Sequence, residues 1–252
     1  MEEKVGNKTY QLGLCYYRGA NGYPLDYDKA FKFISAAANA GNDEAMHMMG
    51  IMYKNGQGVQ KSCQLAVDCF YRAIKINSGN GYAAFDLGRM YYMGQGVEKN
   101  YKLAFDFLDC AIALGLDSKL SYVSSASYFV GCILMEQKKY KESIKYFMGA
   151  AKLGNIPQAW HNLGWVCELG AFDDVEKNKI PATAMSFYKE AANLGFAQSM
   201  DAVGRIYASV SMLDEAEQWI RKAADKGYEP AKKRLKYLKA AKSGHISDLF
   251  FN

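Results

Sequence analysis

A short motif centred on glycine recurs six times along the chain and constrains its fold more than any other feature. The six glycines are Gly13, Gly50, Gly88, Gly131, Gly164 and Gly204. Successive copies lie 37, 38, 43, 33 and 40 residues apart, and an aliphatic residue or methionine precedes each glycine. An interval of this size accommodates two helices and their connection, so the sequence predicts a helical hairpin that is repeated six times.

A second pattern follows each glycine and predicts the other helix of the hairpin. It begins with a small residue at Ala30, Ala66, Ala104, Ser143, Ala184 and Ala216. An aromatic residue three positions later, in five copies, and an alanine seven positions later place one apolar stripe along a helix. The eleventh position holds Gly41, Asn77, Gly115, Gly154, Gly195 and Gly227. Glycine, or asparagine as its best substitute, predicts a left-handed residue that ends this helix.

The motif glycine is expected inside the first helix of each hairpin, where it costs about 1 kcal/mol relative to alanine. Close approach of the paired helix is expected to offset this cost. Neither helix can bury its apolar stripe alone, so stacked hairpins should share one continuous core. The chain of 252 residues is therefore predicted to form a single elongated unit.

Two blocks of the sequence, residues 50–59 and 88–97, strongly resemble Sel1-like repeats, the longer-looped relatives of tetratricopeptide repeats. Residues 191–195 and 223–227 are similar to the ends of their second helices. The resemblance covers about residues 8–231. It implies an all-α fold, a right-handed α-α superhelix (solenoid) of about six Sel1-like or TPR-like helical hairpins with a C-terminal capping helix. The fourth and sixth repeats lack the Gly-x-Gly-Val loop and look like plain tetratricopeptide units.

The repeats are expected at about residues 8–44, 45–82, 83–122, 123–158, 159–198 and 199–231, with a basic capping helix and an apolar tail in residues 232–252. This last segment carries six cations and one anion, whereas residues 1–231 carry 25 of each. A neutral body argues against a protein built to bind nucleic acid. For the basic helix at 231–242, capping of the solenoid is the favoured interpretation, and binding of nucleic acid or anionic membrane is the alternative. The apolar tail contains Ile246, Leu249, Phe250 and Phe251.

Motifs that carry chemistry are missing from the sequence. The three histidines and six cysteines have no zinc-ligand spacing, and no G-x-S-x-G or H-E-x-x-H motif occurs. The Gly-Gln-Gly stretches at 56–58 and 94–96 lack the P-loop pattern and are expected to be tight turns. We therefore expect no enzyme, no cofactor and no metal; an enzyme whose site forms across repeats is a weaker alternative.

The cellular location is expected to be the cytoplasm. The first residues are polar and acidic, and neither a signal peptide nor a membrane-spanning run follows them. The six cysteines form no C-x-x-C pair and are expected to be reduced.

A stripe on the first helix of each repeat, facing away from the core, predicts the binding surface. Positions −3, +1, +4 and +5 relative to the glycine lie on this face at 100° per residue. Resemblance to tetratricopeptide repeats implies that these positions line a concave groove. The candidates are Tyr10, Tyr17, Arg18, His47, Lys54, Phe85, Arg89, Tyr92, Tyr128, His161, Trp165 and Arg205.

These residue types are suited to binding, because tyrosine, tryptophan and arginine anchor protein interfaces. The alternative is that they pack between successive first helices as ordinary core. The sequence thus favours a scaffold or adaptor that binds a peptide or a protein face in the groove. A protein or peptide partner is expected, and no small-molecule substrate; nucleic acid and membrane are the disfavoured partners.

Overall fold

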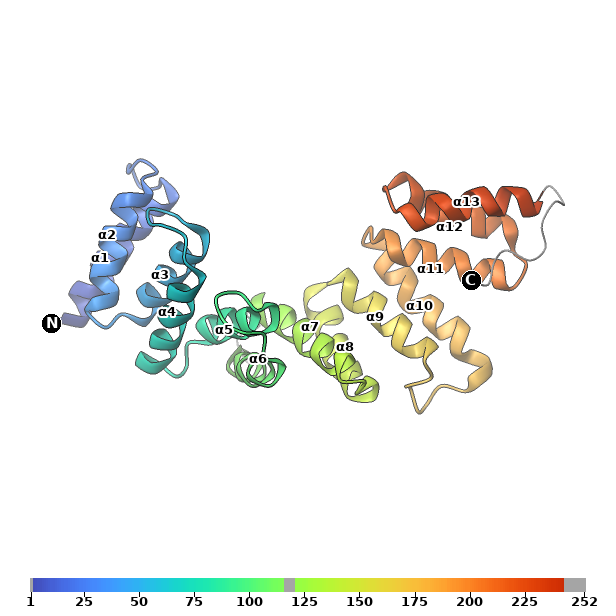
Figure 1. Ribbon diagram of the computed structural model, residues 1–252, viewed down its shortest axis with the longest axis horizontal. Coiled ribbons are helices and arrows are strands. Elements are labelled where there is room, and N and C mark those ends of the chain that lie inside the picture. The colour runs from blue at the N-terminus through green and yellow to red at the C-terminus, as the bar shows by residue number, and fades with distance from the viewer. Residues whose placement is uncertain (1, 116–120, 243–252) are drawn as a thin grey trace. The chain divides into compact units, whose positions relative to one another are not determined.

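The computed structural model describes residues 2–115 and 121–242 of the chain, and this part consists of helices and connections without a strand (Figure 1). The chain divides into two compact units, residues 1–133 and 134–252, where the sequence predicted a single unit. The boundary lies inside α7 (Ser121–Glu136). We describe each unit separately.

Unit 1 consists of helical hairpins that follow one another along the chain. Its helices are α1 (Glu2–Arg18), α2 (Tyr27–Asn39), α3 (Asp43–Asn55), α4 (Cys63–Ile76), α5 (Gly81–Met93), α6 (Tyr101–Gly115) and the greater part of α7. Helix α1 packs on α2, α3 on α4 and α5 on α6, as Figure 1 shows from blue to green. The second helix of one hairpin also contacts the first helix of the next, at α2–α3 and α4–α5.

Unit 2 repeats this arrangement. Its helices are α8 (Tyr140–Gly154), α9 (Pro157–Glu168), the short 3-10 helix η1 (Lys177–Lys179), α10 (Ile180–Asn193), α11 (Ala197–Ser209), α12 (Leu213–Asp225) and α13 (Glu229–Lys242). Hairpins form between α9 and α10 and between α11 and α12, and α10 contacts α11. The predicted all-α solenoid fold of helical hairpins is confirmed. The predicted repeat boundaries stay a prediction.

Five motif glycines have the predicted role of bringing paired helices together: Gly13, Gly50, Gly88, Gly164 and Gly204. A Cβ atom added to Gly88 in α5 would lie 2.7 Å from Cγ of Leu108 in α6. At Gly50 in α3 it would lie 2.6 Å from Cε1 of Phe70 in α4. Both distances are shorter than side chains tolerate, so a larger residue would push the two helices of the hairpin apart.

The Gly-x-Gly loops form tight turns, as predicted. Gly58, with φ 66°, lies against the backbone of Tyr27 at the start of α2, and a Cβ atom here would overlap the Tyr27 carbonyl. Gly96 lies in the same way against the backbone of Cys63 at the start of α4. Each loop therefore packs on the second helix of the preceding hairpin.

The prediction of left-handed residues at the ends of the second helices is half correct. Gly41, Gly195 and Gly227 have φ angles of 88°, 88° and 85° and confirm it. Asn77 does not, because its φ is −138°, and its side chain instead accepts a hydrogen bond from the Gly79 amide at 2.9 Å. The asparagine thus stabilises the turn through its side chain rather than through a left-handed backbone.

The prediction is also wrong for two other glycines. Gly154 is the last residue of α8, and the left-handed residue is Asn155, with φ 47°, so the helix runs one residue further than expected. Gly115 is the last residue of α6, and its φ is not left-handed either. In both cases the helix includes the glycine, and after Gly154 the left-handed residue follows at Asn155.

The basic segment predicted at the C-terminal end is α13, which packs on α12. Leu238 is buried and Leu235 half-buried in a cluster that includes Ile220 of α12. Arg234 forms an ion pair with the buried Asp201 of α11. These contacts support the capping role. The apolar tail at 246–251 lies outside the described residues.

Two further findings bear on the predicted chemistry and location. All six cysteines fall within the described part of the chain, and none of them is joined in a disulfide. Over the same part, every helix is too short or too polar to cross a membrane. The cytoplasmic location stays a prediction.

Candidate binding site

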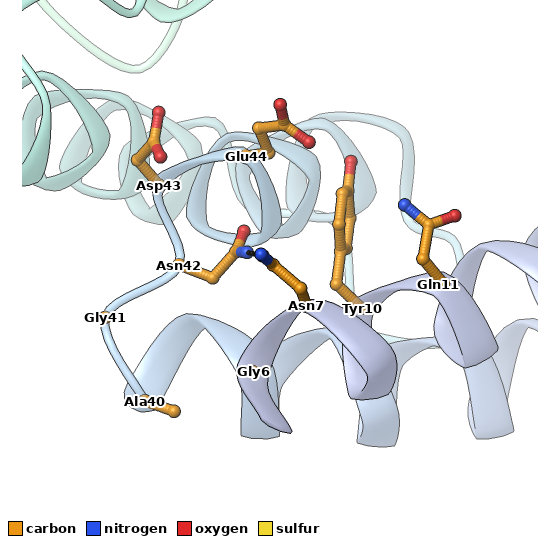
Figure 2. Close-up of a pocket in the computed structure, with 9 residues that line it drawn as sticks. All are labelled: Gly6, Asn7, Tyr10, Gln11, Ala40, Gly41, Asn42, Asp43 and Glu44. Carbon is orange, nitrogen blue, oxygen red and sulfur yellow. Dashed lines mark hydrogen bonds between the residues drawn. The ribbon is translucent and has the colours of Figure 1, made fainter. Parts of the chain in front are cut away.

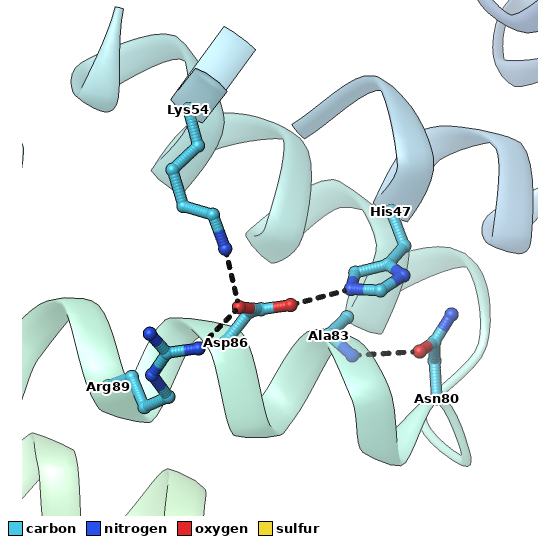
Figure 3. A network of polar contacts seen from close by, with 6 residues as sticks. All are labelled: His47, Lys54, Asn80, Ala83, Asp86 and Arg89. Atoms are coloured by element: carbon cyan, nitrogen blue, oxygen red, sulfur yellow. Dashed lines mark hydrogen bonds and ion pairs between the residues drawn. The ribbon is translucent and has the colours of Figure 1, made fainter. Parts of the chain in front are cut away.

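The side chain of Asp86 in α5 is the centre of a polar cluster in unit 1 (Figure 3). Its Oδ2 lies 2.9 Å from Nε2 of His47, and its Oδ1 lies 2.8 Å from Nζ of Lys54, both on α3. Nη1 of Arg89, one turn further along α5, lies 3.6 Å from Oδ1. The structure thus brings together three predicted groove residues around one carboxylate. We call these four residues the Asp86 cluster.

Asp86 itself was missed by the sequence argument. It stands two positions before the glycine, outside the four positions assigned to the groove, and is only 8% exposed. The other repeats carry Gln11, Met48, Phe129, Asn162 and Ala202 at this position. Asp86 is the one carboxylate at this position among the six repeats, and it is close in sequence to the candidate Arg89. This combination is the signal that could have identified it.

The ionisation of Asp86 follows from its partners. Burial by itself raises the pKa of this carboxyl group, but the hydrogen bond from His47 and the charge and hydrogen bond of Lys54 outweigh it. The pKa of Asp86 falls from 3.8 to about 2. The carboxylate is therefore ionised at neutral pH and holds α3 against α5.

Arg89 is less completely engaged than the other cations of the cluster. Its guanidinium carbon lies 5.5 Å from the ring centre of Phe85 and 5.8 Å from that of Phe129. Its buried Nε has no hydrogen-bond partner, and among the described residues it is the one buried side-chain nitrogen or oxygen in that condition. The side chain is still 33% exposed. Arg89 is thus positioned by two rings and retains unused hydrogen-bond donors.

The aromatic candidates of unit 1 pack on one another and remain half-exposed. Phe85 stacks on Tyr122 at 5.9 Å between ring centres, and Tyr92 contacts Phe129 at 5.3 Å. Tyr128 lies edge-on to Phe129, and burial, followed by the adjacent Cys132, raises its pKa. These rings contact neighbouring helices of unit 1 while keeping part of their surface in solvent.

The candidates on α1 are separated from the Asp86 cluster. Tyr10 is buried and lines a cavity of about 650 Å³ between α1 and the start of α3 (Figure 2). The hydroxyl of Tyr17 donates a hydrogen bond to Oε1 of Gln57 at 3.0 Å, and Arg18 is exposed at the end of the helix. Tyr17 therefore links α1 to the loop after α3.

In unit 2, the structure separates an enclosed candidate from two exposed ones. Nδ1 of His161 lies 2.8 Å from Oγ of Ser199, and its ring contacts Tyr188 and Phe196. Trp165 is 36% exposed and lies edge-on to Tyr140, whereas Arg205 is exposed on α11. Trp165 and Arg205 are accessible to a partner, and His161 fills space between helices.

We expect an NMR titration to show a low pKa for the His161 imidazole. Burial, followed by the charge of Arg205, lowers this pKa from 6.5 to about 4. Because the folded value lies below the unfolded one, the stabilisation is complete above pH 6.5 and is lost as the pH falls towards 4. The resonance that disappears in His161→Gln identifies the group. A midpoint near 6.5 would contradict the described burial.

The fold and the site define a class of protein, the α-solenoids of tetratricopeptide type. The Sel1 repeat family model matches residues 9–42, 43–78, 81–116, 157–196 and 213–228, so the chain belongs to the Sel1 repeat family. These matches leave out residues 117–156, which include most of the fourth predicted repeat. A comparison with curated proteins finds no match.

Solved structures share this fold. A Sel1 repeat protein from Oxalobacter formigenes is 23% identical with a TM-score of 0.73, covering 96% of this chain and 92% of its own. PilF of Pseudomonas aeruginosa is 17% identical with a TM-score of 0.66 over 95% and 99% of the two chains. YrrB, a TPR protein with an unusual peptide-binding site, is 17% identical with a TM-score of 0.57 over 86% and 99%. At these identities the likeness shows the fold alone.

The part of the chain that the structure describes contains no cluster of side chains that could bind a metal ion. No group of three or more histidine, cysteine, aspartate or glutamate side chains there could hold a metal ion. The Asp86 cluster combines one carboxylate with cations, a composition that suits binding of an anionic group rather than of a metal.

Proposed function

We propose that the protein is a non-enzymatic scaffold or adaptor that binds a peptide segment or a protein face on the first helices of its hairpins. The observation that carries this proposal is the state of Arg89. This side chain is held between two phenyl rings, is one-third exposed and keeps unused donors. An arginine positioned in this way can bind a partner without further ordering of its own side chain.

The charge of the Asp86 cluster indicates the chemistry of the partner. Lys54 and Arg89 carry two positive charges against the single negative charge of Asp86. Lys54 is 21% and Arg89 33% exposed, so both can be reached from solvent. A carboxylate of the partner, from an acidic side chain or a chain end, would balance the excess charge, and the rings of Phe85, Tyr92 and Phe129 would contact the residues beside it.

The remaining candidates extend this surface within each unit. His47 supports Asp86, Tyr17 and Arg18 lie on α1, and Trp165 and Arg205 offer an aromatic and a cationic anchor in unit 2. The fold supports the same function, since YrrB, which shares it, is a TPR protein with a peptide-binding site. Assignment of the twelve residues to a binding groove stays part of the proposal.

A role for α13 in binding nucleic acid or membrane has less support. Arg234 is paired with Asp201 and Lys232 with Glu229, and Leu238 is buried against the rest of unit 2. Two of its cations are thus engaged within the protein, and two leucines of its apolar face, Leu235 and Leu238, pack in a cluster with α12.

The test is a comparison of partners captured from native lysate by wild type, Arg89→Ala and Arg72→Ala. Arg72 is an exposed arginine on α4, the second helix of its hairpin, and serves as the matched control. We expect Arg89→Ala to weaken binding of a captured partner by about 2 kcal/mol, roughly thirtyfold, and Arg72→Ala to leave it unchanged. If both variants bound the partner equally and had unchanged melting transitions, the assignment of the binding site to the first helices would be wrong.

A further inference from the structure

A row of cations and aromatic rings extends from the Asp86 cluster towards the end of α5 in unit 1. The guanidinium carbon of Arg89 lies 5.8 Å from the ring centre of Phe129 on α7, and this ring lies 5.3 Å from that of Tyr92. Nζ of Lys99 in turn lies 5.8 Å from the Tyr92 ring. We call these four residues the cation–ring row. It has a positive charge at each end and two rings between them.

Lys99 is positioned by two tyrosine rings and not by a carboxylate. It lies in the connection between α5 and α6, and its Nζ is 4.5 Å from the ring centre of Tyr101 at the start of α6. The rings of Tyr92 and Tyr101 lie 5.8 Å apart, so the ammonium group interacts with both. Lys99 is exposed and forms no ion pair with any described residue, its neighbour Glu98 included. Its charge is therefore held in place but not neutralised.

The other end of the row has donors that the protein does not use. Both oxygens of Asp86 are already engaged, by His47 at 2.9 Å and by Lys54 at 2.8 Å. Nη1 of Arg89 lies further away, at 3.6 Å from Oδ1. Nε of Arg89 is buried and is the one such side-chain nitrogen or oxygen without a hydrogen-bond partner among the described residues. Because buried donors in folded proteins normally have a partner, this group points to a ligand.

The order of charges and rings indicates the chemistry of the partner. In an extended peptide, the side chains at positions 1, 3 and 5 point to the same side. At about 3.3 Å per residue they span about 13 Å, which fits the spacings of the row. Carboxylates at the two ends would bind Arg89 and Lys99. An apolar side chain between them would cover Phe129 and Tyr92, which are half-buried.

We propose that unit 1 binds an extended peptide segment with acidic residues at its first and fifth positions and an apolar residue at its third. The inference rests on the proposed function, because one of the two acids occupies the site formed by Arg89 and Lys54. It adds Lys99 as a second anchor and gives the order of side chains that the partner carries. A single-stranded nucleic acid also combines anionic and flat groups, but residues 1–231 carry 25 cations and 25 anions and so do not attract a polyanion in general.

The experiment is a titration of the 15N-labelled full chain with blocked peptides of seven residues. The parent peptide is acetyl-Ser-Asp-Ser-Phe-Ser-Asp-Ser-amide. We expect it to bind with a Kd of about 0.1 mM and to shift the Nε–H signal of Arg89, which is identified by its absence in Arg89→Ala. Moving the phenylalanine by one position keeps the composition but turns its ring to the other side of the chain, which should weaken binding about tenfold. Equal binding of the two peptides would overturn the proposal.

A double-mutant cycle tests the contact between Lys99 and the second acid. Replacing one aspartate of the peptide by asparagine should weaken binding about threefold, and so should Lys99→Gln with the parent peptide. Because both changes remove the same contact, the asparagine peptide should bind wild type and Lys99→Gln equally. Lys102→Gln, at an exposed lysine in the first turn of α6, is the matched control and should bind the parent peptide as wild type does. Equal affinity of Lys99→Gln and Lys102→Gln would overturn the proposal.

The same variants distinguish this inference from the proposed function. If Arg89→Ala weakened binding of the parent peptide and Lys99→Gln did not, the proposed function would stand and the second anchor would be wrong. If Arg89→Ala bound the parent peptide as wild type does, both would be wrong. A strand of ten thymidine nucleotides tests the other class of partner, and tighter binding of this strand than of the parent peptide would overturn the assignment to an acidic peptide.

Discussion

Asp86→Ala is expected to lower the free energy of unfolding by about 3 kcal/mol. The substitution leaves Lys54, His47 and Arg89 close together without the carboxylate that holds them. The effect falls at the lower end of the range for breaking a buried ion pair, because Lys54 keeps 21% of its side chain in contact with water. Urea unfolding followed by circular dichroism measures this change.

The matched control is Asp68→Ala, which removes an exposed carboxylate from α4 in the same unit and should change stability by less than about 0.5 kcal/mol. If Asp86→Ala lowered the free energy of unfolding as little as Asp68→Ala does, the cluster would not hold α3 against α5.

Acid should remove part of the difference between wild type and Asp86→Ala. The pKa of Asp86 in the folded protein, about 2, lies below its ordinary value of 3.8. The stabilisation is therefore present above pH 4 and is lost as the pH falls from about 4 to about 2. About 2 kcal/mol of the difference is expected to disappear over this interval. A difference that stays constant down to pH 2 would contradict an ionised, paired Asp86.

Tyr188→Ala is expected to destabilise the protein by about 4 kcal/mol. Tyr188 in α10 is 1% exposed, and its ring lies against Gly164 of α9, where an added Cβ atom would come within 2.6 Å of it. Truncation leaves a cavity between α9 and α10 that the close helix contact cannot fill without movement of the backbone.

A second substitution at this position distinguishes the contribution of the ring to stability from that of the hydroxyl. The hydroxyl donates a hydrogen bond to Oε2 of Glu168 at 2.8 Å, and Glu168 is exposed. Tyr188→Phe should therefore cost only about 1 kcal/mol, because water replaces the lost donor. Tyr237→Ala, at a tyrosine that is 45% exposed on α13, is the control for the loss of a ring at the surface. Similar losses in Tyr188→Ala and Tyr237→Ala would contradict the described packing.

The fold was predictable because the repeated glycine and alanine positions act through contacts inside one hairpin. Gly50 and Gly88, for example, each lie 20 residues before the side chain that they face on the next helix, Phe70 or Leu108. The ends of helices were less predictable. Asn77 could satisfy its turn with a left-handed backbone or with its side chain, and only the surrounding chain decides between them.

The candidate site was predictable in its residue types but not in its arrangement. His47, Lys54 and Arg89 follow from helical periodicity, but their meeting at Asp86 depends on how α3 and α5 are offset along their axes. Periodicity also could not show that Tyr10 and His161 are covered by residues from other helices. Exposure depends on neighbours that are distant in sequence, whereas the helical face depends on local spacing.

The loop glycines make a contact between neighbouring hairpins, and the side chains on the first helices are not needed for that contact. Gly58 and Gly96 contact the backbone of the preceding hairpin, so this contact does not depend on which side chains that hairpin carries. Side chains on the first helices can then be exchanged during evolution without loss of the stacking between repeats. A hairpin with this loop could equally be duplicated and inserted after another, which offers a physical route by which arrays of this kind change in length and in the partners they select.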